Sequence, residues 1–84
     1  GKAELEFKKR NYRTAADLYN NLFLIYETLN NKNYANLAQC KLFIGKCFYE
    51  LGEKEKAREA LKEVIGFKKY SDKYPQIKSG SSPN

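Results

Sequence analysis

Several residue types that carry chemistry are scarce or missing in this chain. It contains no histidine, so no side chain with an unperturbed pKa near neutral pH is present as an acid or base. It has only two cysteines, Cys40 and Cys47, in no Cys-x-x-Cys motif, so a zinc site would have too few soft ligands. We find no glycine-rich phosphate loop and no nucleophile with a base beside it. The sequence therefore predicts no catalytic residue, no metal and no cofactor, and it argues against an enzyme.

The two cysteines and the lack of long apolar runs bear on location. Cys40 and Cys47 stand seven residues apart. On a helix this places their Cα atoms about 10 Å apart, which is too far for a disulfide, so we interpret both as buried, reduced thiols. Reduced thiols favour a cytoplasmic protein. No apolar run approaches the roughly 18 residues that span a membrane, and no signal-peptide pattern opens the chain. Because it starts at Gly1 and contains no methionine, we expect a piece of a longer protein.

Positive charge exceeds negative charge in a composition otherwise typical of a small folded domain. The 84 residues include 16 Lys and Arg against 10 Asp and Glu, a net charge of +6. This charge favours acidic partners through long-range attraction. The charges are spread, however, and the arginines number only three, Arg10, Arg13 and Arg58. This pattern is more typical of an ordinary basic helical surface than of a dedicated nucleic-acid site.

An internal repeat is the most informative feature that is present. The segment from Phe7 to Tyr19 and the segment from Tyr49 to Leu61 share a pattern at a period of 42 residues. Each has an apolar helix end, a short polar turn and then an alanine that opens a second apolar stripe. Self-similarity at a fixed period is the signature of stacked helical hairpins, which mostly bind other proteins. The matched pairs are Phe7 with Tyr49, Ala15 with Ala57, Tyr19 with Leu61, Leu22 with Val64 and Phe23 with Ile65.

Apolar spacing predicts about four helices and an all-α fold. Residues 1–9 are typical of the last turns of a helix, and apolar positions at spacings of three and four predict helices over 12–29 and 34–51. Asn11 is the expected N-cap of the second helix, and Gly52 the expected stop of the third. The fourth helix opens with Glu53, Lys54 and Glu55 and runs to about residue 68. The predicted domain is 1–78, with repeat one at 1–29, repeat two at 34–68, a short extra helix or turn at 70–78, and a flexible tail at 79–84.

The second repeat resembles a tetratricopeptide repeat. That family's motif has a large apolar residue followed by glycine, an aromatic, a turn glycine, an alanine and further apolar positions. The first repeat is a partial copy with Ala3 in the glycine place and Glu6 where the second has Phe48. The resemblance implies antiparallel hairpins stacked as a right-handed solenoid with a long period. It also implies that helix backbones come close at Gly45 and Ala57, where no large side chain fits. The matching residues are Ile44, Gly45, Phe48, Gly52, Ala57, Leu61, Val64 and Pro75.

The resemblance also implies where a partner binds. In tetratricopeptide proteins the first helix of each hairpin lines a concave groove. An aromatic side chain with a lysine nearby suits a protein or peptide with an apolar anchor and an acidic group. We therefore expect an interaction or assembly scaffold that binds a peptide or partner helix. Transferred by position, the expected groove residues are Glu4, Phe7 and Lys8 from the first helix, with Gln39, Leu42, Phe43, Lys46, Tyr49 and Glu50 from the third.

Other interpretations stay open at this point. The same residues suit the interface to a neighbouring repeat, or a self-association surface on the third helix, which is apolar on two faces. A less favoured alternative is a basic helical module that binds RNA or DNA, which would weaken steeply with salt. Its candidate residues are Lys8, Lys9, Arg10 and Arg13, next to Tyr12.

Overall fold

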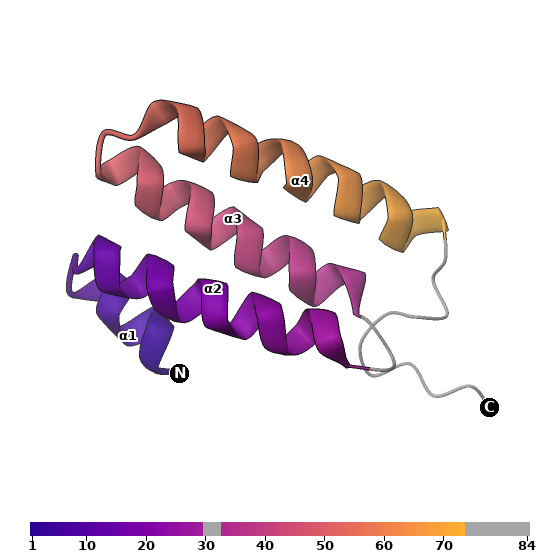
Figure 1. Cartoon of the computed structure of the whole chain (residues 1–84), viewed down its shortest axis with the longest axis horizontal. Coiled ribbons are helices and arrows are strands. Elements are labelled where there is room, and N and C mark those ends of the chain that lie inside the picture. The colour runs from indigo at the N-terminus through magenta and orange to yellow at the C-terminus, as the bar shows by residue number, and fades with distance from the viewer. Residues whose placement is uncertain (30–32, 74–84) are drawn as a thin grey trace.

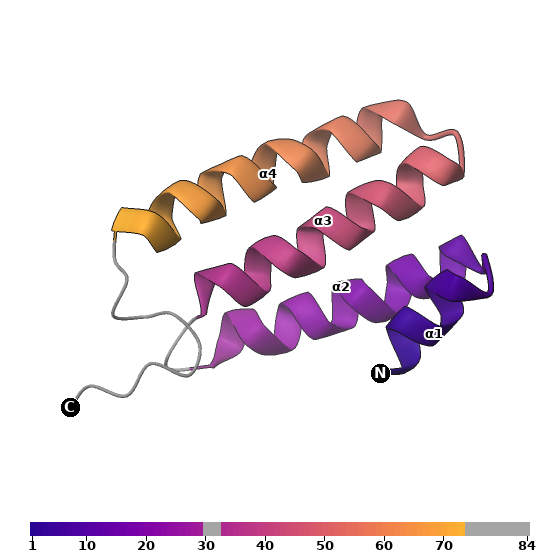
Figure 2. The ribbon, with the colours of Figure 1, turned by 180° about the vertical axis from the view of Figure 1, so that it is seen from behind.

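The structure is a computed structural model that describes residues 1–29 and 33–73. The described residues form helices and connecting turns, without strands. Figure 1 shows α2, α3 and α4 side by side, each antiparallel to the next, with α1 against the first half of α2. Figure 2 shows the same order from behind. The predicted all-α fold of about four helices is confirmed: α1 is Lys2–Lys8, α2 is Tyr12–Thr28, α3 is Tyr34–Glu50 and α4 is Lys54–Lys73.

The turn inside each hairpin is built in the same way, 42 residues apart. Arg10 and Gly52 both have a left-handed backbone, with φ of 68° and 81°. The next residue in each turn donates its backbone N–H to a carbonyl five residues back, at 2.9 Å in both cases. This pattern closes a helix end by satisfying carbonyls that have no partner inside the helix. Gly52 is therefore the stop that the sequence predicts, while the first turn places an arginine in the strained position.

Asparagines precede two of the helices and act differently. Asn33 accepts a hydrogen bond from the backbone N–H of Asn36 at 3.0 Å and so caps α3. Asn11 precedes α2 as predicted, but its side chain does not cap the helix. It donates instead to the carboxylate of Glu6 at 2.8 Å. Glu6 stands at the repeat position that Phe48 occupies in the second repeat. Its hydrogen bond with Asn11 therefore stabilises the first turn.

The last helix is longer than the sequence indicates. Residues 70–73, which the sequence assigns to an extra helix or turn, continue α4 without a break. Neither proline nor glycine interrupts this stretch, and the Tyr70 ring packs against Tyr34 at 4.3 Å. Ser71 is buried. Residues 74–84, with the predicted tail, lie outside the described residues.

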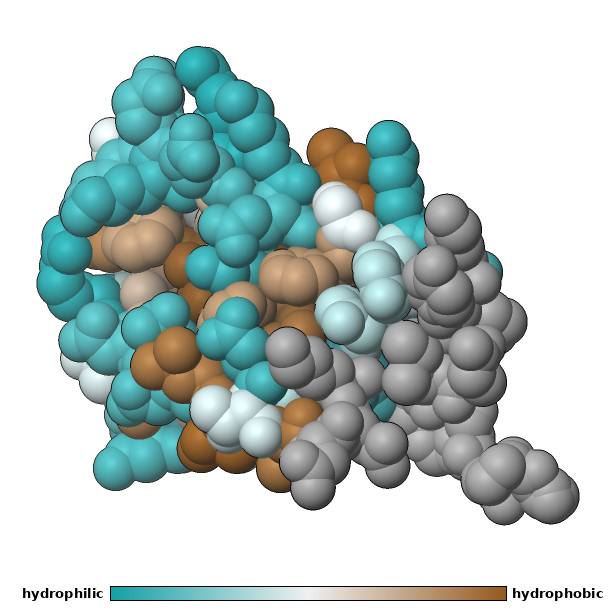
Figure 3. Space-filling model, turned by 45° about the vertical axis from the view of Figure 1, so that its right-hand side comes forward, coloured by the Kyte–Doolittle hydropathy of each residue, from teal (hydrophilic) through white to brown (hydrophobic). Residues whose placement is uncertain are grey.

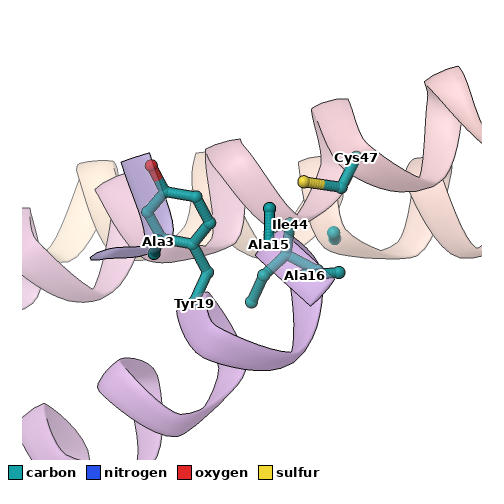
Figure 4. Close-up of a cluster of buried hydrophobic side chains, with 7 residues drawn as sticks. Ala3, Ala15, Ala16, Tyr19, Ile44 and Cys47 are labelled. Carbon is teal, nitrogen blue, oxygen red and sulfur yellow. The ribbon is translucent and has the colours of Figure 1, made fainter. Parts of the chain in front are cut away.

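Small residues form much of the core where α1, α2 and α3 meet. Ala15 and Cys47 are completely buried, and Ala3, Ala16 and Ala60 are nearly so. Figure 4 shows several of these side chains gathered around Tyr19 and Ile44. Small side chains let helix backbones approach, and the aromatic ring fills the space beside them. A second cluster lies further along α2, α3 and α4 and contains Phe23, Leu37 and Cys40, with Tyr26, Tyr34 and Phe67 packed against it.

The close approach predicted at Gly45 is confirmed. A Cβ atom built on Gly45 would lie 3.1 Å from the Cδ2 of Leu61 and 3.5 Å from the carbonyl oxygen of Ala57. A larger side chain would therefore push α4 away from α3. Lys41 stands one turn before Gly45. Its ammonium pairs with Glu63 at 3.4 Å and lies 4.5 Å from the centre of the Phe23 ring, so the half-buried lysine is paired rather than isolated.

Candidate binding surfaces

The nine side chains predicted to line a groove lie on α1 and α3, and they differ in exposure. Phe7, Leu42 and Phe43 are half-buried, and the rest are exposed. On the face seen in Figure 3, hydrophilic surface interrupts the apolar surface, so apolar side chains form separate patches. Those predicted groove residues that line a hollow are divided among three separate hollows.

Phe7 and Phe43 are engaged mainly inside the protein. The Phe43 ring stacks on Tyr19 of α2 at 4.9 Å, with an angle of 11° between the rings. Phe7 packs edge-on against both Phe43 and Tyr12, at 5.5 Å in each case. These contacts join α1, α2 and α3, and aromatic pairs of this kind add about 0.5–1.5 kcal/mol beyond the area they bury. The two rings offer a partner only the part that stays exposed.

One hollow brings three of the predicted residues together. Glu4, Gln39 and Phe43 line a space of about 310 Å³ between α1, α2 and α3, which we call the α1–α3 hollow. Tyr19 lies at this hollow, and its pKa is raised above the ordinary value by burial and then by the charge of Glu4. The phenol therefore stays protonated and can donate or accept a hydrogen bond. The other lining residues are Gly1, Ala3, Leu22, Tyr26, Asn36 and Cys40.

The contribution of α2 to this hollow was not predicted from the sequence. Leu22 and Tyr26 belong to the apolar stripe that predicts α2, and neither is among the expected groove residues. In the structure Leu22 is exposed and Tyr26 half-buried. The apolar stripe of α2 is visible in the sequence, but which of its residues are exposed depends on the neighbouring helix.

Leu42 borders a second hollow on the other side of α3. This space of about 360 Å³ lies between α3 and α4, and Val64, Lys68 and Asp72 contribute to it. Gln39 lines both this hollow and the α1–α3 hollow. Its side chain therefore stands on the ridge between them, and its amide can hydrogen-bond to a ligand on either side.

The remaining predicted residues lie toward the other end of α3 or on α1. Lys46 is exposed, and its ammonium lies 5.0 Å from the centre of the Phe43 ring. Tyr49 is 63% exposed and borders a third hollow that it shares with α4. Lys8 and Glu50 are exposed. None of these four residues lines the α1–α3 hollow, although Lys46 contacts one of its lining residues, Phe43.

The candidate nucleic-acid residues are partly engaged in internal contacts. The Arg13 guanidinium pairs with the Glu53 carboxylate, which links α2 to the turn before α4. The hydrogen bond from Arg13 and then that from Lys56 hold the pKa of Glu53 below its ordinary value. Tyr12, the aromatic of this set, packs against Phe7. Tyr12 is therefore engaged in the fold. Arg13 is paired but stays 63% exposed, and Lys8, Lys9 and Arg10 are exposed as well.

The two thiols are buried in the core, as their spacing predicts. Both are free cysteines, and burial raises the pKa of each, that of Cys47 to about 11. Since the thiolate is the reactive form, these thiols are poor nucleophiles near neutral pH. Within residues 1–29 and 33–73, we find no cluster of three or more side chains able to hold a metal ion.

Comparison with known protein families identifies the family of the chain. A family model described as the tetratricopeptide repeat matches residues 1–69 of the chain. No curated protein and no solved structure matches. In the part of the chain that the structure describes, no helix combines the length and the apolar character needed to cross a membrane.

Proposed function

Because the chain belongs to the tetratricopeptide repeat family, we propose that it is a protein-binding scaffold whose α1–α3 hollow receives a peptide or a partner helix. Members of this family typically serve as non-catalytic interaction scaffolds. The α1–α3 hollow is the observation that carries the finer proposal, because it gathers Glu4, Gln39 and Phe43 beside exposed apolar surface of α2.

The lining of the hollow combines the two kinds of surface that a peptide needs. Tyr19, Leu22 and Phe43 provide apolar surface for a side-chain anchor. Asn36 and Gln39 carry amides that can donate to and accept from a peptide backbone. A small set of polar groups around an apolar floor is typical of binding sites, where the polar groups set the orientation of the ligand.

Rigid support is the second argument for binding at this surface. The lining residues belong to preformed helices, and the stacked rings of Tyr19 and Phe43 hold α2 against α3. A partner that docks here would need little ordering of the scaffold, which favours affinity. The Lys46 ammonium lies 5.0 Å from the centre of the Phe43 ring, and Lys8 is exposed in the last turn of α1. The net charge of +6 adds long-range attraction for acidic partners. An acidic peptide with an apolar anchor is therefore the proposed ligand class.

The location and the alternatives follow from the same features. We propose a cytoplasmic location from the two buried, reduced thiols. The scaffold role assigns no catalytic step, cofactor or metal to the chain. Self-association and nucleic-acid binding remain the competing hypotheses, and the experiment below separates them from peptide binding.

The test is a selection of short random peptides on the wild-type protein, followed by titration calorimetry of a recovered peptide. We expect Leu22→Glu to weaken that peptide by about tenfold or more, since it places a carboxylate in the hollow. Leu24→Glu is the matched control, because Leu24 is also exposed on α2 but does not line the hollow.

Three outcomes decide between the hypotheses. Equal binding to both variants would place the peptide elsewhere and contradict the proposal. Sedimentation over a concentration series would reveal self-association. A single-stranded RNA probe that binds, with affinity falling steeply in salt, would favour the nucleic-acid alternative.

A further inference from the structure

The internal repeat allows each face of α4 to be compared with its counterpart on α2. At the 42-residue period, Leu61 corresponds to Tyr19 and Ile65 to Phe23. Tyr19 and Phe23 are 7% and 6% exposed, whereas Leu61 and Ile65 are 42% and 57% exposed. The same repeat position is therefore core in the first hairpin and surface in the second.

The cause of the difference is a covering helix. In the first hairpin α3 lies over this face: Phe43 stacks on Tyr19, while Leu37 and Cys40 pack in one cluster with Phe23. Among the described residues, no helix lies over the equivalent face of the second hairpin. Its side chains line a hollow of about 330 Å³ instead. We call this surface the α4 patch: Tyr49, Ala57, Leu61 and Ile65 at its centre, with Lys54, Arg58 and Lys62 around them.

The charges around the α4 patch are all of one sign. Lys54, Arg58 and Lys62 are exposed, and no carboxylate lines the hollow. Arg58 pairs with Glu55 at 3.4 Å, but both side chains are largely exposed, so this ion pair is weak and readily exchanged. Lys54 and Lys62 form no ion pair with a described residue. The patch thus offers apolar contact framed by three positive charges, of which only that of Arg58 has an ion-pair partner among the described residues.

The sequence after α4 does not repeat the helix that covers the first hairpin. At the same period, Leu37, Ala38 and Cys40 correspond to Ser79, Gly80 and Ser82. The apolar residues needed to cover the α4 patch are therefore not present at that register. A second copy of the chain is also disfavoured, because two α4 patches brought face to face would oppose like charges.

We propose that the α4 patch binds an amphipathic helix of another protein, with an apolar stripe flanked by aspartate and glutamate. The helix would lie where a further hairpin's first helix would stand, as α3 does on α2. Apolar side chains would cover Leu61 and Ile65, and the flanking carboxylates would meet Lys54, Arg58 and Lys62. This surface is separate from the α1–α3 hollow, and the proposal does not depend on peptide binding there.

The test uses two synthetic helical peptides with the same leucine stripe, one flanked by glutamate and the other by lysine. Binding is measured by titration calorimetry at low and high salt. We expect the glutamate-flanked peptide to bind the wild type at least about tenfold more tightly, and the advantage to shrink with salt. Ile65→Glu should weaken that peptide by about tenfold or more, and Lys62→Glu should weaken it and reduce the salt dependence.

The matched control is Ile25→Glu. Ile25 is 55% exposed on α2, close to the 57% of Ile65, but it lies outside the α4 patch. Unchanged binding to Ile25→Glu and to the hollow variant Leu22→Glu would support the proposal and separate it from the proposed function. Equal affinity for the two peptides, or equal loss in Ile65→Glu and Ile25→Glu, would overturn it. So would a wild-type dimer that Ile65→Glu converts to a monomer, since the occupant would then be a second copy.

Discussion

The two hairpins share a sequence pattern, yet the second halves of α2 and α4 are buried to opposite degrees. Leu22 of α2 and Leu29, the residue that follows α2, are 37% and 49% exposed. Their counterparts 42 residues later, Val64 and Ser71 of α4, are 8% and 5% exposed. In each pair the residue with the smaller side chain is therefore the more buried one.

The described residues that lie beside each helix account for this reversal. α1 has seven residues and lies against the first half of α2, whereas α3 has 17 and runs beside most of α4. Tyr34 at the start of α3 packs against Phe67 and Tyr70 near the end of α4. Burial in a hairpin is thus set by the helix that covers a position, and hydropathy alone does not predict it.

The largest expected effect comes from truncating a buried side chain of α3, the helix that lies beside α4. Leu37 is 1% exposed in the cluster that joins α2, α3 and α4. Leu37→Ala should lower the free energy of unfolding by about 2–5 kcal/mol, through lost apolar contact and the cavity left behind. Leu29→Ala, at a position without a covering helix, should cost less than about 0.5 kcal/mol. Urea unfolding monitored by circular dichroism measures both, and equal costs would contradict the comparison.

A substitution in the first hairpin turn should have an intermediate effect, and it should raise the free energy of unfolding where Leu37→Ala lowers it. Arg10 adopts a φ of 68° where the second hairpin has Gly52. A left-handed backbone costs a residue with a side chain roughly 1–2 kcal/mol, so Arg10→Gly should stabilise the protein by about 1 kcal/mol. Lys9→Gly is the control, because Lys9 has φ of −77° and glycine there should destabilise. Thermal unfolding of both variants checks the sign, and a destabilised Arg10→Gly would show that the turn is not strained.

The smallest effect concerns the ion pair that links the two hairpins. Arg13 on α2 pairs with Glu53 in the second turn, and the pKa of Glu53 is held below its ordinary value of 4.5. A lowered pKa means that the pair stabilises the fold above pH 4.5, and that this stabilisation is lost as pH falls through the lowered pKa. Glu53→Gln should therefore melt below the wild type at neutral pH, and the gap should close in acid. A gap that does not change with pH would show that the ionised pair makes no contribution.

Much of the fold was predictable because its signals are local. Apolar spacing placed the helices to within a residue or two at most ends, and the glycine at position 52 marked the turn before α4. The end of α4 was placed too early, because its last turns are held by contact with Tyr34 from a distant part of the sequence. The close approach at Gly45 followed from residue size and was correct.

The candidate sites were predictable only in part. The groove prediction named Glu4, Gln39 and Phe43, which line one hollow, but it treated Phe43 as a side chain presented to a partner. Its stacking on Tyr19 joins positions 19 and 43, on different helices, and no spacing rule within one helix reveals it. The α4 patch was missed for the same reason, since Leu61 and Ile65 have the spacing of core residues.

By itself the sequence determined which segments are helices, where the hairpins turn and that the two hairpins are related. These properties depend on backbone preferences and on periodicity along one chain, which act over a few residues. Only the tertiary structure decided which apolar faces are covered. Tyr19 became core because α3 of the next hairpin covers it, whereas Leu61 touches Gly45 of its own hairpin but has no helix of a following hairpin over it among the described residues. Burial is thus a property of the neighbour as much as of the residue.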